Sequence, residues 1–147
     1  MKTAIITLII AALLGLSTLA LAHGVRNNNP GNIRAGIDVW KGQVGVDSDG
    51  FVIFDTIING FRAMYKTLLT YRRKYDLNTI AGIITRWAPP ESNNTSAYIA
   101  KVSQRLGIKP DAPLNLSDYP TLMLAIAKQE TGRTYNLTDA KTGVSLS

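Results

Sequence analysis

Cysteine is absent from the 147 residues, and histidine occurs once, at His23. Without cysteine the chain cannot form a disulfide, so its folded state depends on packing alone. The sequence also lacks a P-loop, a dinucleotide-binding fingerprint and the residue spacing of a zinc site. A thiol protease is thereby excluded, and one histidine argues against a serine triad or a metal-dependent peptidase. We therefore expect no cofactor and no metal.

Acidic residues are scarce as well, with 10 Asp and Glu against 16 Lys and Arg, and a formal net charge of +6. Glu91 and Glu130 are the only glutamates. A basic chain attracts anionic partners. For an exported protein, cell-wall polymers and lipid headgroups are better candidates than nucleic acid, so we expect no nucleic-acid partner.

The first 22 residues have the pattern of a secretory signal peptide. Lys2 precedes an apolar run from Ala4 to Leu19, and Ala20-Leu21-Ala22 is a small-x-small cleavage site. The alternative is a retained anchor, because Ala4 to Ala22 is long enough to cross a bilayer as a helix. Residues 23–147 then form one periplasmic or extracellular domain. Retention would make it membrane-tethered or virion-associated, with this segment as its only membrane contact.

Residues 23–34, HGVRNNNPGNIR, are rich in Asn, Gly and Pro without an apolar period, which predicts a structured loop. Asn29 and Asn32 supply amide donors and acceptors, and Arg34 supplies a planar cation. Such groups suit recognition of a sugar or a carboxylate. An ordinary tight turn is the alternative.

A β-hairpin is predicted next, because the turn signal Asp47-Ser48-Asp49-Gly50 separates two β-prone runs, 39–46 and 51–54. Asp47 and Asp49 could suggest calcium. An EF-hand loop, however, needs three spaced acidic residues before its glycine and a glutamate at its end. The metal interpretation is therefore weak.

The rest of the chain is predicted to be helical. Residues 60–75 have a broad apolar face, and Asn78 is expected to cap a short helix whose core positions end at Trp87. A third helix begins at 93–95 and ends at Gly107, with Tyr98, Ile99, Val102 and Leu106 facing inward. A fourth begins at Ser117 and Asp118 and ends at Glu130, and the tail after Tyr135 is expected to be loose. The fold class is α+β, mainly helical, with one small hairpin.

Glu130 occupies a position where the helical pattern calls for an apolar side chain. Leu122, Ile126 and Glu130 are each four residues apart, so the carboxyl points at the core. Burial and the negative end of the helix, which Gly132 would close, should both raise its pKa. A general acid near neutral pH needs such a pKa. The alternative is a structural carboxylate that caps a neighbouring element or pairs with Arg133.

Several short motifs, taken in order, resemble a known family. The chain looks like phage and prophage cell-wall lysins, among them relatives of the virion lysin of enveloped double-stranded RNA phages, which have the lysozyme-like lytic transglycosylase fold. The resemblance covers nearly all of 24–135, and RNNNPGNIR is its most specific string. The other motifs are Trp40-x-Gly42, Phe51-x-x-Phe54, Gly60-Phe61-Arg62-Ala63, Trp87-Ala88-Pro89-Pro90-Glu91, Tyr98-Ile99 and Gln129-Glu130-x-Gly132.

Gln129-Glu130-Thr131-Gly132 is also similar to the end of the catalytic helix in lysozyme-like glucosaminidases and lytic transglycosylases. In those enzymes that helix comes first, and a loop like 29–34 and a Trp-x-Gly hairpin follow it. Here the helix comes last, so we hypothesise a circularly permuted lysozyme-like domain. The hypothesis fails if Glu130 lies far from both Asn29, in the loop, and Trp40, in the hairpin.

The resemblance implies an exported enzyme that cleaves peptidoglycan between N-acetylmuramic acid and N-acetylglucosamine, with Glu130 as general acid and base. A hydrolase needs a second carboxylate, for which Asp47, Asp49 and Glu91 are available. A lytic transglycosylase can dispense with it, because the sugar's own 6-hydroxyl attacks. A non-catalytic wall-binding or virion structural module of the same fold is the alternative.

The expected partner is the peptidoglycan glycan strand, bound by a monomer. Core packing remains an alternative for Trp40 and Tyr98. The residues expected to bind substrate are Asn29, Asn32, Arg34, Trp40, Glu91 and Tyr98.

Overall fold

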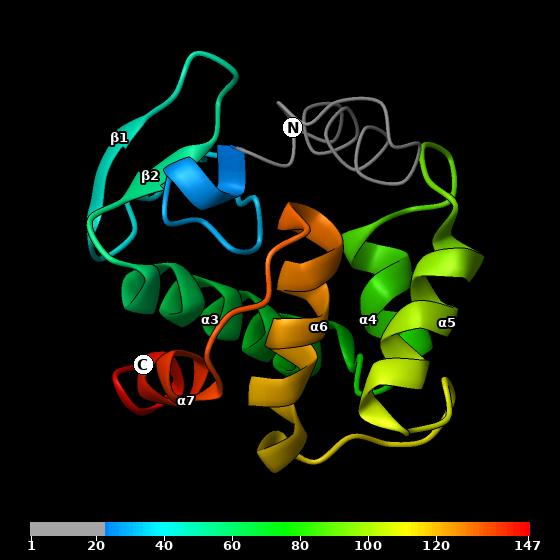
Figure 1. Cartoon of the computed structure of the whole chain (residues 1–147). Helices are drawn as coiled ribbons and strands as arrows, with labels where there is room; N and C mark the ends of the chain where they lie inside the picture. The colour runs from blue at the N-terminus through cyan, green and yellow to red at the C-terminus, as the bar shows by residue number, and fades with distance from the viewer. Residues whose placement is uncertain (1–22) are drawn as a thin grey trace.

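The computed structural model describes residues 23–147 (Figure 1). One helix, α6, lies at the centre, with α3 and α7 on one side and α4 and α5 on the other. The expected α+β class, mainly helical with a small hairpin, is confirmed. The predictions for 1–22, a signal peptide or anchor, lie outside these residues. The helices are α3 (Ile57–Tyr75), α4 (Ile80–Trp87), α5 (Thr95–Leu106), the 3-10 turn η1 (Leu116–Asp118), α6 (Tyr119–Thr131) and α7 (Leu137–Ser145).

The hairpin consists of β1 (Gln43–Val46) and β2 (Val52–Phe54), paired antiparallel, with Val46 opposite Val52. Its turn is closed by the Asp47 N–H, which donates to the Phe51 carbonyl at 2.9 Å, and Gly50 has the positive φ of 89° that the turn needs. The predicted hairpin is confirmed, although the first strand is shorter than the expected 39–46.

Four helices, α3, α4, α5 and α7, begin at residues whose side chains accept a hydrogen bond from the first turn, as the cap preferences predict. Thr56 caps α3 and Asn94 caps α5, which ends at Gly107 with φ 65°. The expected cap of α4, Asn78, is wrong, because Thr79 accepts the bond from the Gly82 N–H at 3.1 Å. Asn78 instead accepts the Leu114 N–H on its backbone carbonyl, and so joins α4 to the connector before α6.

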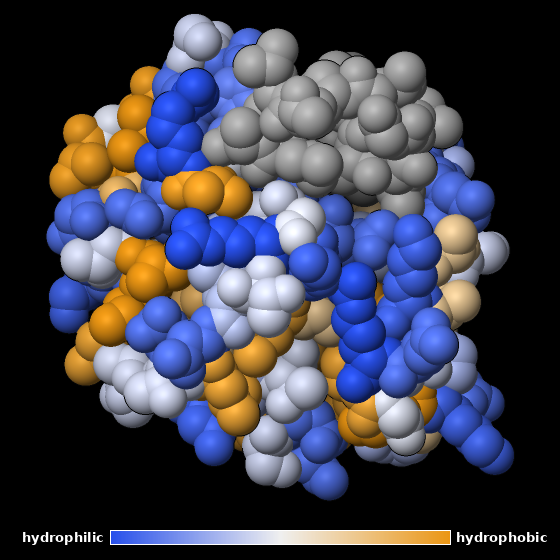
Figure 2. Space-filling view, in the orientation of Figure 1, coloured by the Kyte–Doolittle hydropathy of each residue, from blue (hydrophilic) through white to orange (hydrophobic). Residues whose placement is uncertain are grey.

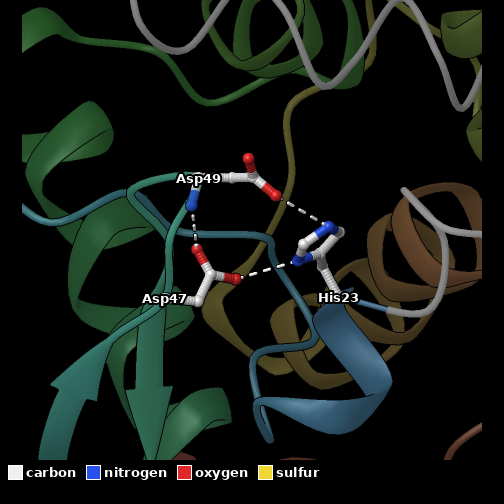
Figure 3. A group of neighbouring side chains, drawn as sticks. All are labelled: His23, Asp47 and Asp49. Atoms are coloured by element: carbon white, nitrogen blue, oxygen red, sulfur yellow. Dashed lines mark hydrogen bonds and ion pairs between the residues drawn. The ribbon is translucent and has the colours of Figure 1, made fainter.

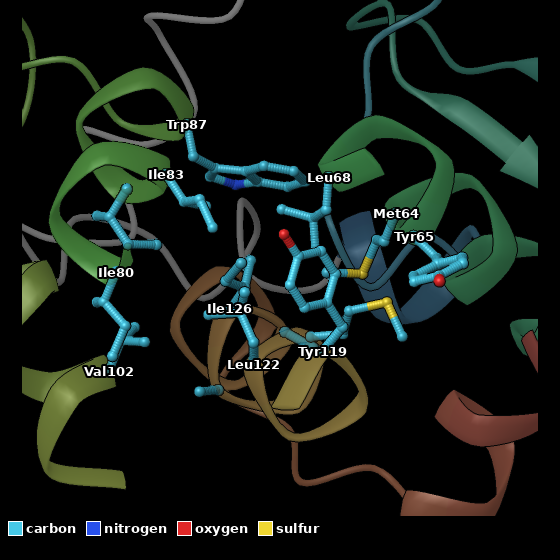
Figure 4. Packing of buried hydrophobic residues seen from close by; sticks show 14 of the residues in the cluster. Met64, Tyr65, Leu68, Ile80, Ile83, Trp87, Val102, Tyr119, Leu122 and Ile126 are labelled. Atoms are coloured by element: carbon cyan, nitrogen blue, oxygen red, sulfur yellow. The ribbon is translucent and has the colours of Figure 1, made fainter. Parts of the chain in front are cut away.

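The core is formed where α3, α4, α5 and α6 meet (Figure 4). Each helix contributes the apolar face that its period predicted, and the row of Leu122 and Ile126 on α6 is fully buried. The expected inward positions of α5 differ in depth, since Tyr98 and Val102 are buried whereas Ile99 and Leu106 are partly buried. Other buried members include Phe61, Met64, Leu68, Ile80, Ile83, Ile84, Trp87, Tyr119 and Met123.

The expectation of a loose tail after Tyr135 is wrong, because 137–145 form α7, which packs against α3 and α6. Asn136 caps this helix by accepting the Thr138 N–H at 2.8 Å. Its buried face consists of two small residues, Ala140 and Gly143, which let the backbones approach closely. A face made of small residues has little hydrophobic period, so the amphipathic pattern was too weak to detect.

Gly143→Val is expected to lower the free energy of unfolding by about 2 kcal/mol. A Cβ at this position would lie 2.8 Å from Phe61 Cβ and 2.9 Å from the Arg62 backbone nitrogen, so α7 would have to move. Urea denaturation measures the change. Gly36→Val is the matched control, because a Cβ at Gly36 meets nothing within 4 Å. Equal stability of the two variants would contradict close docking of α7 on α3.

The segment 23–34 is less irregular than expected, because residues 23–26 form a helical turn before the Asn-rich loop begins. Its asparagines then bond mainly to distant parts of the chain, Asn28 to the Phe54 carbonyl and Asn29 to the carbonyls of Val52 and, locally, Ile33. None of the helices within 23–147 has the length and apolar character needed to cross a membrane.

Candidate functional site

Glu130 lies in the last turn of α6, with only 1 % of its surface exposed. Gly132 ends the helix in the left-handed conformation, with φ 72°, as its position predicted. The Tyr98 hydroxyl donates to Glu130 Oε1 at 2.9 Å. The Asn32 side-chain amide donates to the Glu130 backbone carbonyl at 3.0 Å and lies 3.4 Å from Oε2. The expected inward orientation of this carboxyl is therefore confirmed.

The surroundings of Glu130 raise its pKa from 4.5 to about 7. Burial is the largest cause, because a low-dielectric environment penalises the ionised form. The donors on Tyr98, Asn32 and, more weakly, Trp87 act in the opposite direction. The expected direction of the shift is confirmed, and a carboxyl with this pKa can both donate and accept a proton near neutral pH.

Glu130 makes no ion pair with Arg133 or with any other residue of 23–147, so the structural pairing considered from the sequence does not occur there. Arg133 is exposed and its guanidinium lies over the ring of Tyr135, 5.3 Å from the centroid. The carboxyl is therefore held by neutral donors, and these shift its pKa far less than an arginine would.

Tyr98 lies in the first turn of α5 and is 1 % exposed, so it is part of the core as well as a neighbour of the carboxyl. Burial, together with the adjacent Glu130, raises the pKa of Tyr98 well above its usual value of 10. The hydroxyl therefore stays protonated and donates. The core-packing alternative for Tyr98 fits this position better than an exposed sugar platform does.

The Asn-rich loop is held against the hairpin by Asn29, which is fully buried. Its side-chain amide donates to the carbonyls of Ile33 and Val52, at 2.8 and 2.9 Å, and its Oδ1 accepts the Ile33 N–H at 2.8 Å. With these groups occupied, Asn29 orients the loop. Asn32, which follows in the left-handed conformation with φ 48°, is the loop residue that reaches Glu130.

The loop also packs directly on the end of α6. A Cβ added to Gly24 would lie 2.5 Å from Thr131 Cγ2 and 2.7 Å from Asn32 Oδ1, so only glycine fits between them. The sequence hypothesis would fail if Glu130 lay far from both Asn29 and Trp40. Contacts of Gly24 and Asn32 with 130–131 place Glu130 beside the loop that contains Asn29.

The other residues expected at the site lie elsewhere. Arg34 stacks on Phe51, 4.1 Å from the ring centroid, and donates to the Asp49 carbonyl. Trp40 is partly buried and packs with Val52, Phe54 and Ala63, which is its core-packing alternative. Glu91 is exposed after α4, and its side chain forms no hydrogen bond or ion pair with residues 23–147. None of the three contacts Glu130 through a hydrogen bond.

A second group of polar residues, missed from the sequence, joins the N-terminal turn to the tip of the hairpin (Figure 3). His23 Nδ1 lies 2.9 Å from Asp47 Oδ2, and its Nε2 lies 3.0 Å from Asp49 Oδ2. Asn27 donates to the same Asp47 oxygen at 2.7 Å. The partners are 20 to 26 residues apart and no spacing rule links them, so the sequence had shown only a turn at 47–50.

His23, Asp47 and Asp49 have the donor types of a cation site, and their ligand atoms lie within 4.8 Å of one another. The hydrogen bonds account for the arrangement without a metal, because each ring nitrogen of His23 faces a carboxylate. The Arg26 guanidinium also lies 3.0 Å from Nδ1, which opposes a metal ion on that nitrogen. We therefore interpret the group as a structural clamp.

Asp47→Ala is expected to lower the free energy of unfolding by about 2 kcal/mol at pH 7. Burial acts to raise the pKa of Asp47, but hydrogen bonds from the Phe51 N–H, Asn27, His23 and the Asp49 N–H outweigh it and lower the pKa to about 2. The stabilisation is therefore complete above pH 4 and is lost as the pH falls through 2.

Urea denaturation at pH 7 and at decreasing pH measures this difference. The gap between the wild type and Asp47→Ala should narrow between pH 4 and pH 2. Asp38→Ala, which removes an exposed carboxylate before the same hairpin, is the control. A gap that stays constant with pH would contradict the assigned role of the ionised carboxylate.

A hollow of about 360 Å³ lies beside the segment that follows Glu130. It is lined by the turn at Val25 and Asn28, the start of α3 and the connector into α7, including Arg133 and Asp139. Glu130 does not line it, because its carboxyl faces Asn32 and Tyr98.

No protein-family model matches the sequence. The chain is 41 % identical over 141 residues to Protein P5 of Pseudoalteromonas phage PM2, a match that covers 90 % of this chain and 88 % of that protein. It belongs to the Protein P5 family. The match to P5 spans nearly the whole of both chains, so the relationship concerns the entire domain and not one motif. Membership in the P5 family supports a phage origin, and the chemistry must be argued from the site.

Proposed function

We propose that this protein is an exported phage enzyme that cleaves peptidoglycan glycan strands, a lysin with Glu130 as its general acid and base. The observation that carries the proposal is a carboxyl with a pKa of about 7, at the end of a central helix and hydrogen-bonded by Tyr98 and Asn32. A structural carboxylate is usually ionised and paired. Glu130 is instead held by neutral donors, which supports a role as proton donor.

The reaction requires a proton on the departing glycosidic oxygen as its bond to the anomeric carbon breaks. Protonated Glu130 supplies it and becomes a carboxylate. In a lytic transglycosylase the 6-hydroxyl of the muramic acid then attacks the anomeric carbon, and Glu130 takes the hydroxyl proton. An anhydro end forms and the acid is regenerated, so no second carboxylate is consumed or required.

The placement of the other carboxylates favours this transglycosylase over a hydrolase. A hydrolase needs a second acid about 5 to 9.5 Å from the first. Asp47 and Asp49 are bound to His23, and Glu91 is exposed on a loop. None of these candidates is hydrogen-bonded to the residues that contact Glu130.

Access to the acid is part of the proposal. A carboxyl with 1 % exposure reaches a sugar oxygen only after neighbouring residues separate from it. Asn32 is bonded to Glu130 Oε2 at 3.4 Å, a weak contact compared with the 2.9 Å bond from Tyr98. We propose that the glycan displaces the Asn32 amide from the carboxyl and takes its place.

The proposed fold family is the lysozyme-like one, in circularly permuted order. Supporting this, the hydrogen bond between Asn32 and Glu130 joins residues 98 positions apart, so α6 meets the first loop of the domain. Export by 1–22 would place the domain in the periplasm or outside the cell, where its net charge of +6 favours the anionic wall. The expected form is a monomer.

Mass spectrometry of purified sacculi treated with the protein tests the proposal. A transglycosylase releases muropeptides with anhydro ends, each lighter by one water than the product of a hydrolase. Release of hydrolysed ends would support the enzymatic function but contradict the transglycosylase mechanism. Release of no soluble product, with the protein folded and the sacculi intact, would exclude the enzymatic function.

A non-catalytic wall-binding or virion structural module is the second candidate. The complete burial of Glu130, with hydrogen bonds to both carboxyl oxygens, favours it, because a purely structural acid needs no access. Such a module would co-sediment with sacculi without releasing product. Binding and release measured on the same sample therefore separate the two functions.

A further inference from the structure

Four aliphatic side chains are exposed within ten residues of the chain, at the hairpin and the loop before it. Ile37 is 85 % exposed, Val39 77 %, Val44 65 % and Val46 46 %. Val44 and Val46 lie two apart on β1 and so share its outward face. Figure 2 shows apolar side chains gathered at this edge of the molecule, over the hairpin of Figure 1. A cluster of this kind marks an interaction surface more often than isolated exposed residues do.

The hairpin does not need these side chains for its own packing. Its inner side is covered by Val52 and Phe54, which are buried against Ala63 with Trp40 beside them. β1 is also an edge strand, where natural sequences place charges to prevent association. Exposed valines at 44 and 46 are the opposite choice, which indicates a surface that is covered in the functional state.

The position of His23 indicates what covers this aliphatic surface. His23 is bonded to Asp47 and Asp49 at the hairpin tip (Figure 3), so the sequence that follows the apolar run 4–22 begins its described part beside the tip, where Val46 ends β1. Charged residues of both signs accompany the exposed aliphatics, since Lys41 and Asp38 are exposed in the same segment and the exposed Arg26 lies 4.0 Å from Asp47. Exposed aliphatic side chains in a domain whose first described residue follows an apolar sequence suit the surface of a bilayer.

We propose that the face formed by Ile37, Val39, Val44 and Val46 docks on a phospholipid bilayer. The aliphatic side chains enter the boundary between headgroups and acyl chains, while the exposed Lys41 contacts a phosphate. The membrane contact then involves the folded domain and not only the N-terminal segment. This proposal is independent of the enzymatic one, because it uses none of the residues around Glu130.

Trp40 provides a local probe, being one of only two tryptophans and the neighbour of Val39. The full chain is mixed with vesicles of phosphatidylglycerol and phosphatidylethanolamine whose acyl chains carry bromine, a short-range quencher. Trp40→Phe defines the signal of Trp87, which is 6 % exposed, and the difference from the wild type is the signal of Trp40. Flotation of the same vesicles reports total binding.

We expect bromine to quench the Trp40 signal in the wild type. The double variant Val39→Ser/Val44→Ser should reduce this quenching at least threefold while the chain still floats with the vesicles. Leu116→Ser is the matched control, since Leu116 is also exposed, at 44 %, but lies in η1 at the other end of α6. It should leave the quenching unchanged.

Three results would overturn the proposal. Trp40 could remain unquenched in the floated wild type, or the serine variant and Leu116→Ser could behave alike. Alternatively, sedimentation could reveal a dimer that Val39→Ser/Val44→Ser abolishes, which would assign the surface to a second copy of the chain.

Discussion

Glu130→Gln is expected to reduce the release of muropeptides from purified sacculi by about a thousandfold, within the range attributed to general acid catalysis. Glutamine keeps the shape of the protonated side chain and can still accept the bond from Tyr98, but it has no acidic proton for the leaving oxygen. Its fold and its binding to sacculi should therefore persist.

The control for Glu130→Gln is a variant that removes a carboxylate far from the site, so that it changes the net charge and leaves the surroundings of Glu130 unchanged. Asp111→Asn serves, because Asp111 is exposed on the connector after α5, away from the residues that contact Glu130. Release should be unaffected in this variant and lost in Glu130→Gln. Full activity of Glu130→Gln would remove the assigned role of the acid, whatever product the wild type forms.

The same substitution is expected to change the pH dependence of stability, by about 2–3 kcal/mol at pH 8. The pKa of Glu130 is about 7 in the folded protein, against 4.5 for the unperturbed group, because burial penalises ionisation. The folded state thus holds this proton more tightly than the unfolded state. Stability from this group is complete below pH 4.5 and is lost as the pH rises through 7.

Glu130→Gln removes that loss, so it should be more stable than the wild type at pH 8 and nearly equal to it at pH 4.5. The repulsion between the glutamine amide and the Asn32 amide makes the gain smaller than the full linkage value. Urea denaturation at the two pH values gives the result. A stability difference that is the same at both would show that Glu130 titrates normally in the folded protein.

Loss of muropeptide release together with higher stability at pH 8 in Glu130→Gln would identify Glu130 as a residue maintained at the expense of stability. A protein selected for stability alone would place glutamine or an apolar residue at the end of α6, where Leu122 and Ile126 already face the core. Retaining a destabilised acid is typical of functional sites.

Much of the fold could be predicted because its signals are local. The apolar period of α4 and α5, the turn at 47–50 and the glycine that ends α6 each act within a few residues. The inward direction of Glu130 also followed from spacing alone, since a four-residue repeat fixes the face of a helix. Helix α7 escaped prediction because its contact face is made of Ala140 and Gly143, which are small and not strongly apolar.

The site could be predicted only in part, for a physical reason. Asparagines in a loop can bond to a ligand or to the backbone, and composition does not distinguish the two. Asn29 proved to be occupied by the backbone, while Asn32, three residues later, reaches the carboxyl. The His23 clamp depends on contacts between residues far apart in the chain, so no local pattern could reveal it.

The amino-acid sequence by itself determined the mainly helical α+β class, the hairpin and the placement of one acid on the core face of α6. These depend on periodicity and turn chemistry, which are properties of neighbouring residues. Only the tertiary structure decided what surrounds that acid, because Tyr98, Asn32 and Glu130 come from three separate segments of the chain. Burial and hydrogen bonds from such distant residues set its pKa, and they exist only once the chain has folded.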